Sequence, residues 1–124
     1  MMVHFNCGEI PVVENAQNLR PVGVVTDRDI ACRTVAQGRD PGRVTAKECM
    51  STPVLTVRDD ASLEDCFELM EHHRVRRLPV VDIAGACWGI ITQADLAKWA
   101  PPDQTGHFLR ELSEPESVGS FGVY

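Results

Sequence analysis

The chain contains one sequence pattern twice, and this repetition limits the possible fold more than any other feature. Residues 78–99 read as a short apolar run, a turn, a second apolar run and a helix that begins after Thr92. Residues 10–33 have the same order, with a helix that begins after Thr26. The two threonines are 66 positions apart, whereas the preceding Pro-Val-Val runs are 68 apart, so the difference falls in the turn. We therefore expect two copies of one supersecondary unit.

Length, charge and cysteine usage narrow the class of protein. A chain of 124 residues with 44% hydrophobic residues fits one domain with a buried core. The net charge of −6 argues against a nucleic-acid partner. The five cysteines form no C-x-x-C pair, which indicates small core residues in a reducing compartment and neither a zinc site nor a disulfide framework. Arginines cluster locally at Arg74, Arg76 and Arg77. This cluster either binds an anionic small molecule or is simply the solvated start of a strand.

The ends of the chain carry no targeting signal that we can identify. The first residues have neither the basic nor the apolar region of a secretion signal, and no run of about 18 apolar residues is present to span a membrane. We therefore expect a cytoplasmic protein that does not enter the membrane. The last residues are rich in Glu, Pro, Ser and Gly and predict a frayed tail, in which residues 105–112 could dock as an amphipathic turn or two.

The first copy of the pattern begins partway through. Residues 1–4 align with the end of the helix that precedes the middle strand of the second copy. The first copy therefore lacks its opening strand and most of its first helix. We divide the chain into a partial first repeat with a linker (1–44), a complete second repeat (45–100) and a C-terminal tail (101–124).

Capping signals and apolar periodicity predict the remaining elements. We expect helices at Asp27–Gln37, at 46–50 after a Thr45–Glu48 capping box, and after Ser62, which forms a second box with Asp65. Pro53 should open a strand at Val54–Val57. The helix after Ser62 has one apolar face, formed by Leu63, Cys66, Phe67 and Met70.

This order of elements resembles the CBS domain. The resemblance rests on an h-P-V-V middle strand and a G-h-h-T-x-x-D sequence entering the last helix, where h is apolar. Two tandem copies resemble the CBS pair, or Bateman module. The match is continuous over residues 49–99 and begins near Met2 in the first copy. It implies an α+β fold of tandem β-α-β-β-α repeats in which the first repeat is incomplete.

CBS pairs are regulatory, non-catalytic modules that bind AMP, ADP, ATP or S-adenosylmethionine between their repeats, and many regulate an enzyme or transporter. By this resemblance, the Thr of each T-x-x-D motif contacts phosphate and the Asp accepts the ribose hydroxyls. The opening strand and the backbone before the middle strand enclose the adenine. The resemblance implies no catalytic residue, metal or required cofactor. It does imply a set of ligand-binding residues, which are Thr26, Asp29, Thr52, Pro53, Val54, Arg76, Leu78, Thr92 and Asp95.

The same motifs also have a purely structural interpretation. A Thr followed by Asp three residues later is a helix-capping arrangement, in which the Thr accepts from a backbone amide and the Asp favours the helix dipole. At the first motif, the missing opening strand strengthens this alternative. From the sequence, both interpretations remain open for Thr26 with Asp29 and for Thr92 with Asp95.

Two further features have alternative interpretations. Glu68 and His72 have an i, i+4 spacing that suits a metal ion, but no third ligand is evident, so a solvated helix end is the simpler explanation. Trp88 and Trp99 fit core or interface anchors, or a platform on which a base stacks.

The incomplete first repeat also bears on assembly. Its missing start should expose the apolar side chains of Ile10, Val12, Val24 and Ile30, which favours a homodimer or a higher homo-oligomer. The alternative function is a ligand-free CBS-type dimerisation scaffold. A redox or metal sensor that uses the free cysteines is a third hypothesis.

Overall fold

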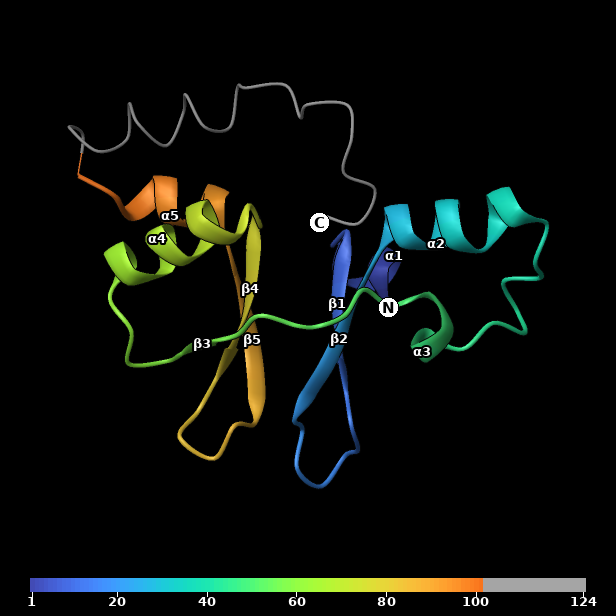
Figure 1. Cartoon of the computed structure of the whole chain (residues 1–124), viewed down its shortest axis with the longest axis horizontal. Helices are drawn as coiled ribbons and strands as arrows, with labels where there is room; N and C mark the ends of the chain where they lie inside the picture. The colour runs from blue at the N-terminus through green and yellow to red at the C-terminus, as the bar shows by residue number, and fades with distance from the viewer. Residues whose placement is uncertain (102–124) are drawn as a thin grey trace.

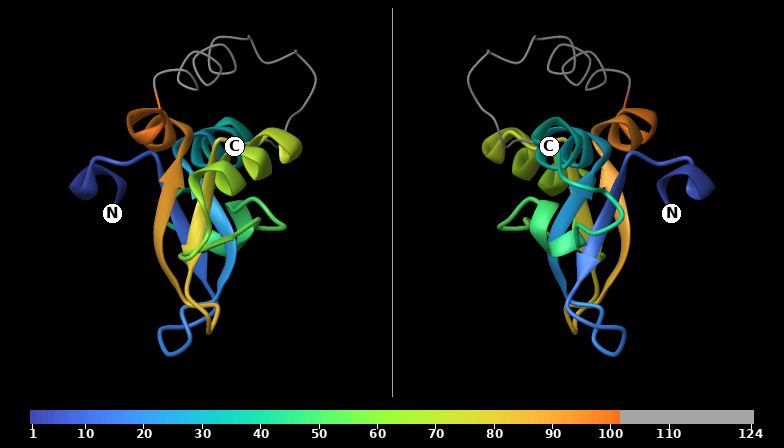
Figure 2. Two further views of the ribbon diagram at one scale, coloured as in Figure 1. Left: turned by 90° about the vertical axis from the view of Figure 1, so that its left-hand side faces the viewer. Right: turned by 90° about the vertical axis from the view of Figure 1, so that its right-hand side faces the viewer.

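The computed structural model describes residues 1–101, which form two β-hairpins side by side with helices at one end (Figure 1). This architecture confirms the expected α+β fold. The turns of both hairpins lie at the end opposite the helices, and α1 projects to one side (Figure 2). The expected amphipathic segment 105–112 lies outside the described residues. Within the described part of the chain, no helix is long and apolar enough to cross a membrane.

The first repeat is a two-stranded antiparallel hairpin followed by a short helix. Glu9 pairs with Thr26 at the end of the hairpin that faces the helices. The repeat and the connection after it contain α1 (Met2–Phe5), β1 (Glu9–Val13), β2 (Pro21–Thr26), α2 (Asp27–Arg33), the 3-10 helix η1 (Val35–Gln37) and α3 (Ala46–Cys49).

The second repeat contains the same hairpin with one more strand, and a longer helix, α4 (Leu63–His73), precedes its hairpin where the first repeat has the short α1. Arg77 pairs with Thr92 in the register that Glu9 and Thr26 have in the first repeat. Both hairpins also shift register before their last pair, so the repetition extends to the hydrogen-bonding pattern. The elements are β3 (Val57–Arg58), α4 (Leu63–His73), β4 (Arg77–Val81), β5 (Cys87–Thr92) and α5 (Gln93–Trp99), with β3 parallel to β4 and β5 antiparallel to it.

The capping predictions are confirmed, with one change in helix length. Reciprocal capping boxes start α3 at Thr45 and α4 at Ser62. The helix expected over Asp27–Gln37 ends at Arg33, and the chain continues as a tighter 3-10 turn. Gly38 ends that turn at a φ of 68°, a left-handed conformation that favours glycine.

The strand expected at Val54–Val57 is wrong, because only its last residue pairs. Ser51 instead forms two backbone hydrogen bonds with Val24 of β2, of 2.8 and 3.2 Å. Residues 52–56 then cross from the first hairpin to the second (Figure 1). Met50 packs closely on Gly23, and a Cβ added at Gly23 would lie 2.5 Å from the Met50 sulfur. At Gly89, the equivalent glycine of the second repeat, an added Cβ would meet nothing within 4 Å.

The apolar core lies in the second repeat, between α4, α5 and the sheet. Leu63 and the two tryptophans are not part of it: Trp88 is 71% exposed and Trp99 77%, so a core role for them is wrong. Val24 was expected to be exposed but is fully buried, because the Ser51 segment covers β2. The core residues are Val57, Cys66, Met70, Leu78 and Leu96.

The repeats provide a matched pair of substitutions for this core. Leu96 and Ile30 occupy equivalent positions, but Leu96 is buried by α4 whereas Ile30 is only half-buried. We expect Leu96→Ala to lower the free energy of unfolding by about 2–5 kcal/mol, and Ile30→Ala to cost less than half as much. Urea unfolding of both variants measures the difference. Equal losses would contradict this account of the core.

Candidate ligand-binding site

The second T-x-x-D motif lies where β5 ends and α5 begins. Thr92 caps the helix, and its hydroxyl accepts a hydrogen bond from the Asp95 amide at 3.1 Å. Asp95 Oδ2 accepts from the Thr92 amide at 3.0 Å and from its hydroxyl at 2.6 Å. The hydrogen bond from the Thr92 hydroxyl is the main reason that the pKa of Asp95 lies below its usual value. The other carboxylate oxygen, Oδ1, lies 3.8 Å from the exposed Lys98 amine, and the Asp95 side chain is 44% exposed.

The start of β4 lies beside this motif. The Arg76 carbonyl accepts a hydrogen bond from the Gln93 amide at 2.9 Å, and Arg77 is the strand partner of Thr92. The expected residues Arg76, Thr92 and Asp95 are therefore gathered at one end of the second hairpin. Leu78 is fully buried in the core, so it supports the site by packing.

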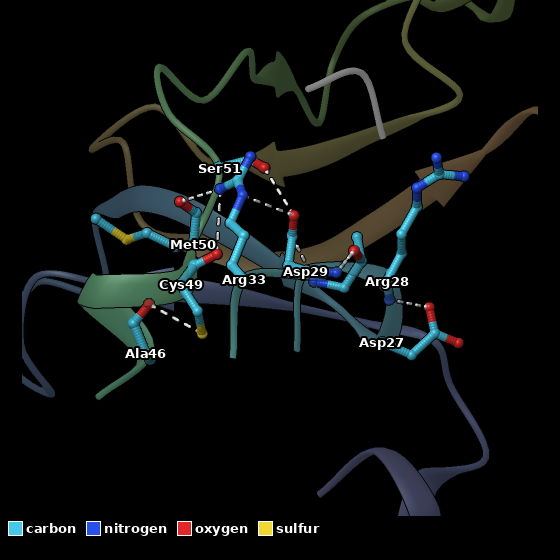
Figure 3. Close-up of polar contacts among 9 residues, drawn as sticks. Asp27, Arg28, Asp29, Arg33, Ala46, Cys49, Met50 and Ser51 are labelled. Atoms are coloured by element: carbon cyan, nitrogen blue, oxygen red, sulfur yellow. Dashed lines mark hydrogen bonds and ion pairs between the residues drawn. The ribbon is translucent and has the colours of Figure 1, made fainter. Parts of the chain in front are cut away.

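The first motif has the same capping box but a different environment. Asp29 Oδ2 accepts from the Thr26 amide at 2.9 Å, while Oδ1 accepts from the Ser51 hydroxyl at 3.2 Å (Figure 3). Arg33 lies 3.7 Å from the same Oδ1 and donates to the carbonyls of Cys49 and Met50. Thr26 is 4% exposed and Asp29 8%. Both oxygens of Asp29 are thus engaged within the protein.

The residues expected to contact adenine lie on the crossing segment between the hairpins. Thr52 and Pro53 are exposed and Val54 is half-buried. They directly follow Ser51, which pairs with the first hairpin, so they lie between the two repeats (Figure 1).

The structure adds an interaction between the repeats that the sequence analysis missed. Arg77 Nη1 lies 3.0 Å from Glu9 Oε2, and the Glu9 side chain is only 5% exposed. Arg77 is therefore paired and not simply solvated, as one interpretation of the basic cluster had it. Glu9 and Arg77 are 68 positions apart, the repeat offset for this strand, so they are equivalent residues of opposite charge. An internal alignment that compared charges could have identified the pair.

A surface hollow lies elsewhere, beside α4. It has a volume of about 670 Å³ and contains none of the expected ligand-binding residues. Its carboxylates disfavour an anionic ligand. Among the described residues, no three His, Cys, Asp or Glu side chains are grouped so that they could hold a metal ion. Glu68 and His72 therefore have no third ligand in this part of the chain. The hollow is lined by Val57, Asp65, Glu68, Leu69, Glu71 and His72.

Together the repeated hairpins and their twin motifs define a protein built from one complete strand–helix–strand–strand–helix unit and one partial copy that lacks the opening strand. The family model for the CBS domain matches residues 1–33 and 46–101. The chain belongs to the CBS domain family, and the recognition made from the sequence is confirmed.

The curated relatives include small CBS proteins. CBS domain-containing protein YhcV of Bacillus subtilis is 47% identical over 97 residues, which cover 78% of this chain and 66% of that protein. The uncharacterized protein MK0525 of Methanopyrus kandleri is 36% identical over 100 residues, covering 81% of this chain. The chain spans only 50% of the length of MK0525.

Solved structures of similar proteins contain different ligands. CBS domain protein PAE2072 of Pyrobaculum aerophilum is complexed with AMP; it has 29% identity and a TM-score of 0.66, and the match covers 76% of this chain and 70% of that one. The CBS pair of MJ0100, with 5-methylthioadenosine and S-adenosyl-L-methionine, has 26% identity and a TM-score of 0.66, covering 79% and 73%. Hypoxic Response Protein I, with two coordinated zinc ions, has 34% identity and a TM-score of 0.67, covering 81% and 78%.

Burial of Glu9 leads to a prediction about pH. Desolvation raises the pKa of Glu9 above 4.5, although the Arg77 guanidinium acts in the opposite direction. A folded carboxyl group with a raised pKa binds its proton more tightly than in the unfolded chain, so its contribution to stability is lost as the pH rises from 4.5 through the folded pKa.

We therefore expect the stability of the wild-type protein, relative to Glu9→Gln, to fall as the pH rises above 4.5. Urea unfolding at a series of pH values measures this difference. Glu14→Gln is the control, because it removes the same charge from an exposed position on the same hairpin. Parallel stability profiles for wild-type and Glu9→Gln would contradict the expected role of burial.

Proposed function

We propose that this protein is a regulatory module that binds an adenosyl ligand (AMP, ADP, ATP or S-adenosylmethionine) at its second T-x-x-D motif and does not act as an enzyme. The observation that carries the proposal is the Asp95 carboxylate at a capped helix start, which is 44% exposed and whose Oδ1 faces only the exposed Lys98 amine, 3.8 Å away, among the described residues. The AMP complex of PAE2072 and the S-adenosyl-L-methionine complex of the MJ0100 pair support the choice of ligand class.

In this proposal each residue near the second motif has a distinct role. Asp95 accepts the two ribose hydroxyls, for which its ionised form is suited. Thr92 holds Asp95 in place through the 2.6 Å hydrogen bond and contacts the 5′ substituent of the ligand. The Arg76 backbone forms one wall of the adenine site, and the crossing segment at Thr52, Pro53 and Val54 forms the other.

The first motif has a structural role in this proposal. The Ser51 hydroxyl and the Arg33 guanidinium occupy Asp29 Oδ1, and burial excludes a ribose from the carboxylate. A ligand would have to break these contacts and expose a buried acid, which costs free energy. We therefore propose one adenosyl ligand per chain.

A regulatory role also requires a second state and a partner. Ligand binding changes an assembly only if the two states bind the ligand with different affinity. We propose that this assembly is a homodimer or higher homo-oligomer, and that it transmits the signal to a regulated enzyme or transporter. The exposed apolar side chains of Val3, Phe5, Ile83, Trp88 and Trp99 support self-association.

The alternative function is a ligand-free interaction scaffold. The hydrogen bonds between Thr92 and Asp95 favour this alternative, because they complete a capping box without any ligand. In that case Asp95 contributes only to stability.

Asp95→Ala distinguishes the two functions. We expect AMP or S-adenosylmethionine to raise the melting temperature of the wild-type protein, since a ligand at a hundredfold excess over its Kd adds about 2.7 kcal/mol of stability. Asp95→Ala should abolish this shift. Asp65→Ala is the control, because Asp65 has the same place in the capping box of α4 that Asp95 has in the capping box of α5. Its substitution should weaken capping to a similar extent and leave the proposed site unchanged. A shift that persists in Asp95→Ala would refute the proposed site.

Self-association is tested separately by the mass in solution. We expect light scattering to give at least twice the 13.7 kDa of the chain, because the exposed apolar side chains are stabilised by contact with a second copy. A monomeric mass across the concentration range would contradict the proposal, whatever the result with ligands.

A further inference from the structure

Glu9 is an acid placed where it affects the charge of the proposed ligand site. Its side chain is 95% buried, since only 5% is exposed, and its Oε1 has no hydrogen-bond partner among the described residues. Its other oxygen is paired with Arg77, the strand partner of Thr92. Glu9 therefore acts directly on the cation that is the strand partner of Thr92.

The position of Arg77 makes it the natural contact for an anionic ligand. Residues that face each other in an antiparallel pair project from the same side of the sheet. The side chains of Arg77 and Thr92 therefore project from the same side, at the end of the hairpin where α5 begins. Without Glu9, the guanidinium of Arg77, whose side chain is 37% exposed, would attract phosphate groups to the Thr92 motif.

Glu9 removes most of this attraction. The carboxylate lies 3.0 Å from the guanidinium, so its repulsion of an anion compensates the attraction by Arg77, and burial of the carboxylate leaves little solvent to screen it. Lys98, which is 72% exposed and lies 3.8 Å from Asp95 Oδ1, adds a cation at the second motif that Glu9 does not contact, and it is the same in wild type and Glu9→Gln. Asp29 is also acidic and interacts electrostatically with Glu9, while Arg33 is held by Asp29 and two backbone carbonyls.

We propose that Glu9 determines which adenosyl ligand the second motif accepts, by holding the Arg77 guanidinium and repelling phosphate groups. The site then prefers a 5′ substituent with little or no negative charge, such as the sulfonium of S-adenosylmethionine, over a di- or triphosphate. This inference rests on the proposed function, because it concerns the charge of the ligand at the same site.

The test is a set of titrations of adenosine, AMP, ATP and S-adenosylmethionine by calorimetry. The wild-type protein should bind S-adenosylmethionine more tightly than ATP. Glu9→Gln keeps the shape of the side chain but frees Arg77 to pair with phosphate. A charge-assisted hydrogen bond of this kind should raise the affinity for ATP about tenfold and leave that for adenosine within about twofold.

The controls separate this inference from the proposed function. Glu14→Gln removes the same charge from an exposed position and should leave the ratio of ATP to adenosine affinity unchanged. If Glu9→Gln also leaves that ratio unchanged, or if Glu14→Gln raises it equally, the role of Glu9 is wrong. If Asp95→Ala binds adenosine as the wild-type does, the proposed site itself is wrong. If the wild-type binds none of the four compounds, both proposals fail.

Discussion

The backbone pairing between Val24 and Ser51 holds the two repeats in their arrangement. Its two hydrogen bonds place the start of the second repeat on the sheet of the first. This pairing buries Val24 and brings the Ser51 hydroxyl to Asp29. It also sets the point from which residues 52–56 cross to the second hairpin. The shape of the region between the repeats therefore depends on a contact made well before the second hairpin begins.

The two T-x-x-D motifs show how one local structure acquires different chemistry from its surroundings. Both form the same reciprocal capping box, since the box depends only on residues three apart. Ser51 and Arg33 then cover the buried carboxylate of the first motif, whereas the Asp95 side chain of the second motif is 44% exposed and faces the exposed Lys98. In the proposed function, the difference in ligand binding between the motifs comes from these long-range contacts and not from the motif itself.

The sequence predicted most of what depends on local chemistry. The repeat and its register follow from apolar spacing, and the capping boxes at Thr45 and Ser62 follow from side chains that bond their own helix. The sequence could not predict contacts between residues far apart along the chain. The shortened β3, the burial of Val24 and the Glu9–Arg77 pair all result from how the hairpins meet. For the tryptophans, the sequence left a core and an interface role open for the same reason, because burial depends on neighbours that apolar character alone does not identify.

The two equivalent glycines have an evolutionary consequence. If the repeats arose by duplication, Gly23 and Gly89 began as copies of one residue, but they now meet different constraints. Met50 leaves no room for a side chain at Gly23, while the space around Gly89 is open. A side chain at Gly89 would therefore meet no steric barrier, whereas one at Gly23 would require both the Met50 side chain and the Ser51 backbone to move. Duplicated residues that still look alike are in this way subject to unequal selection.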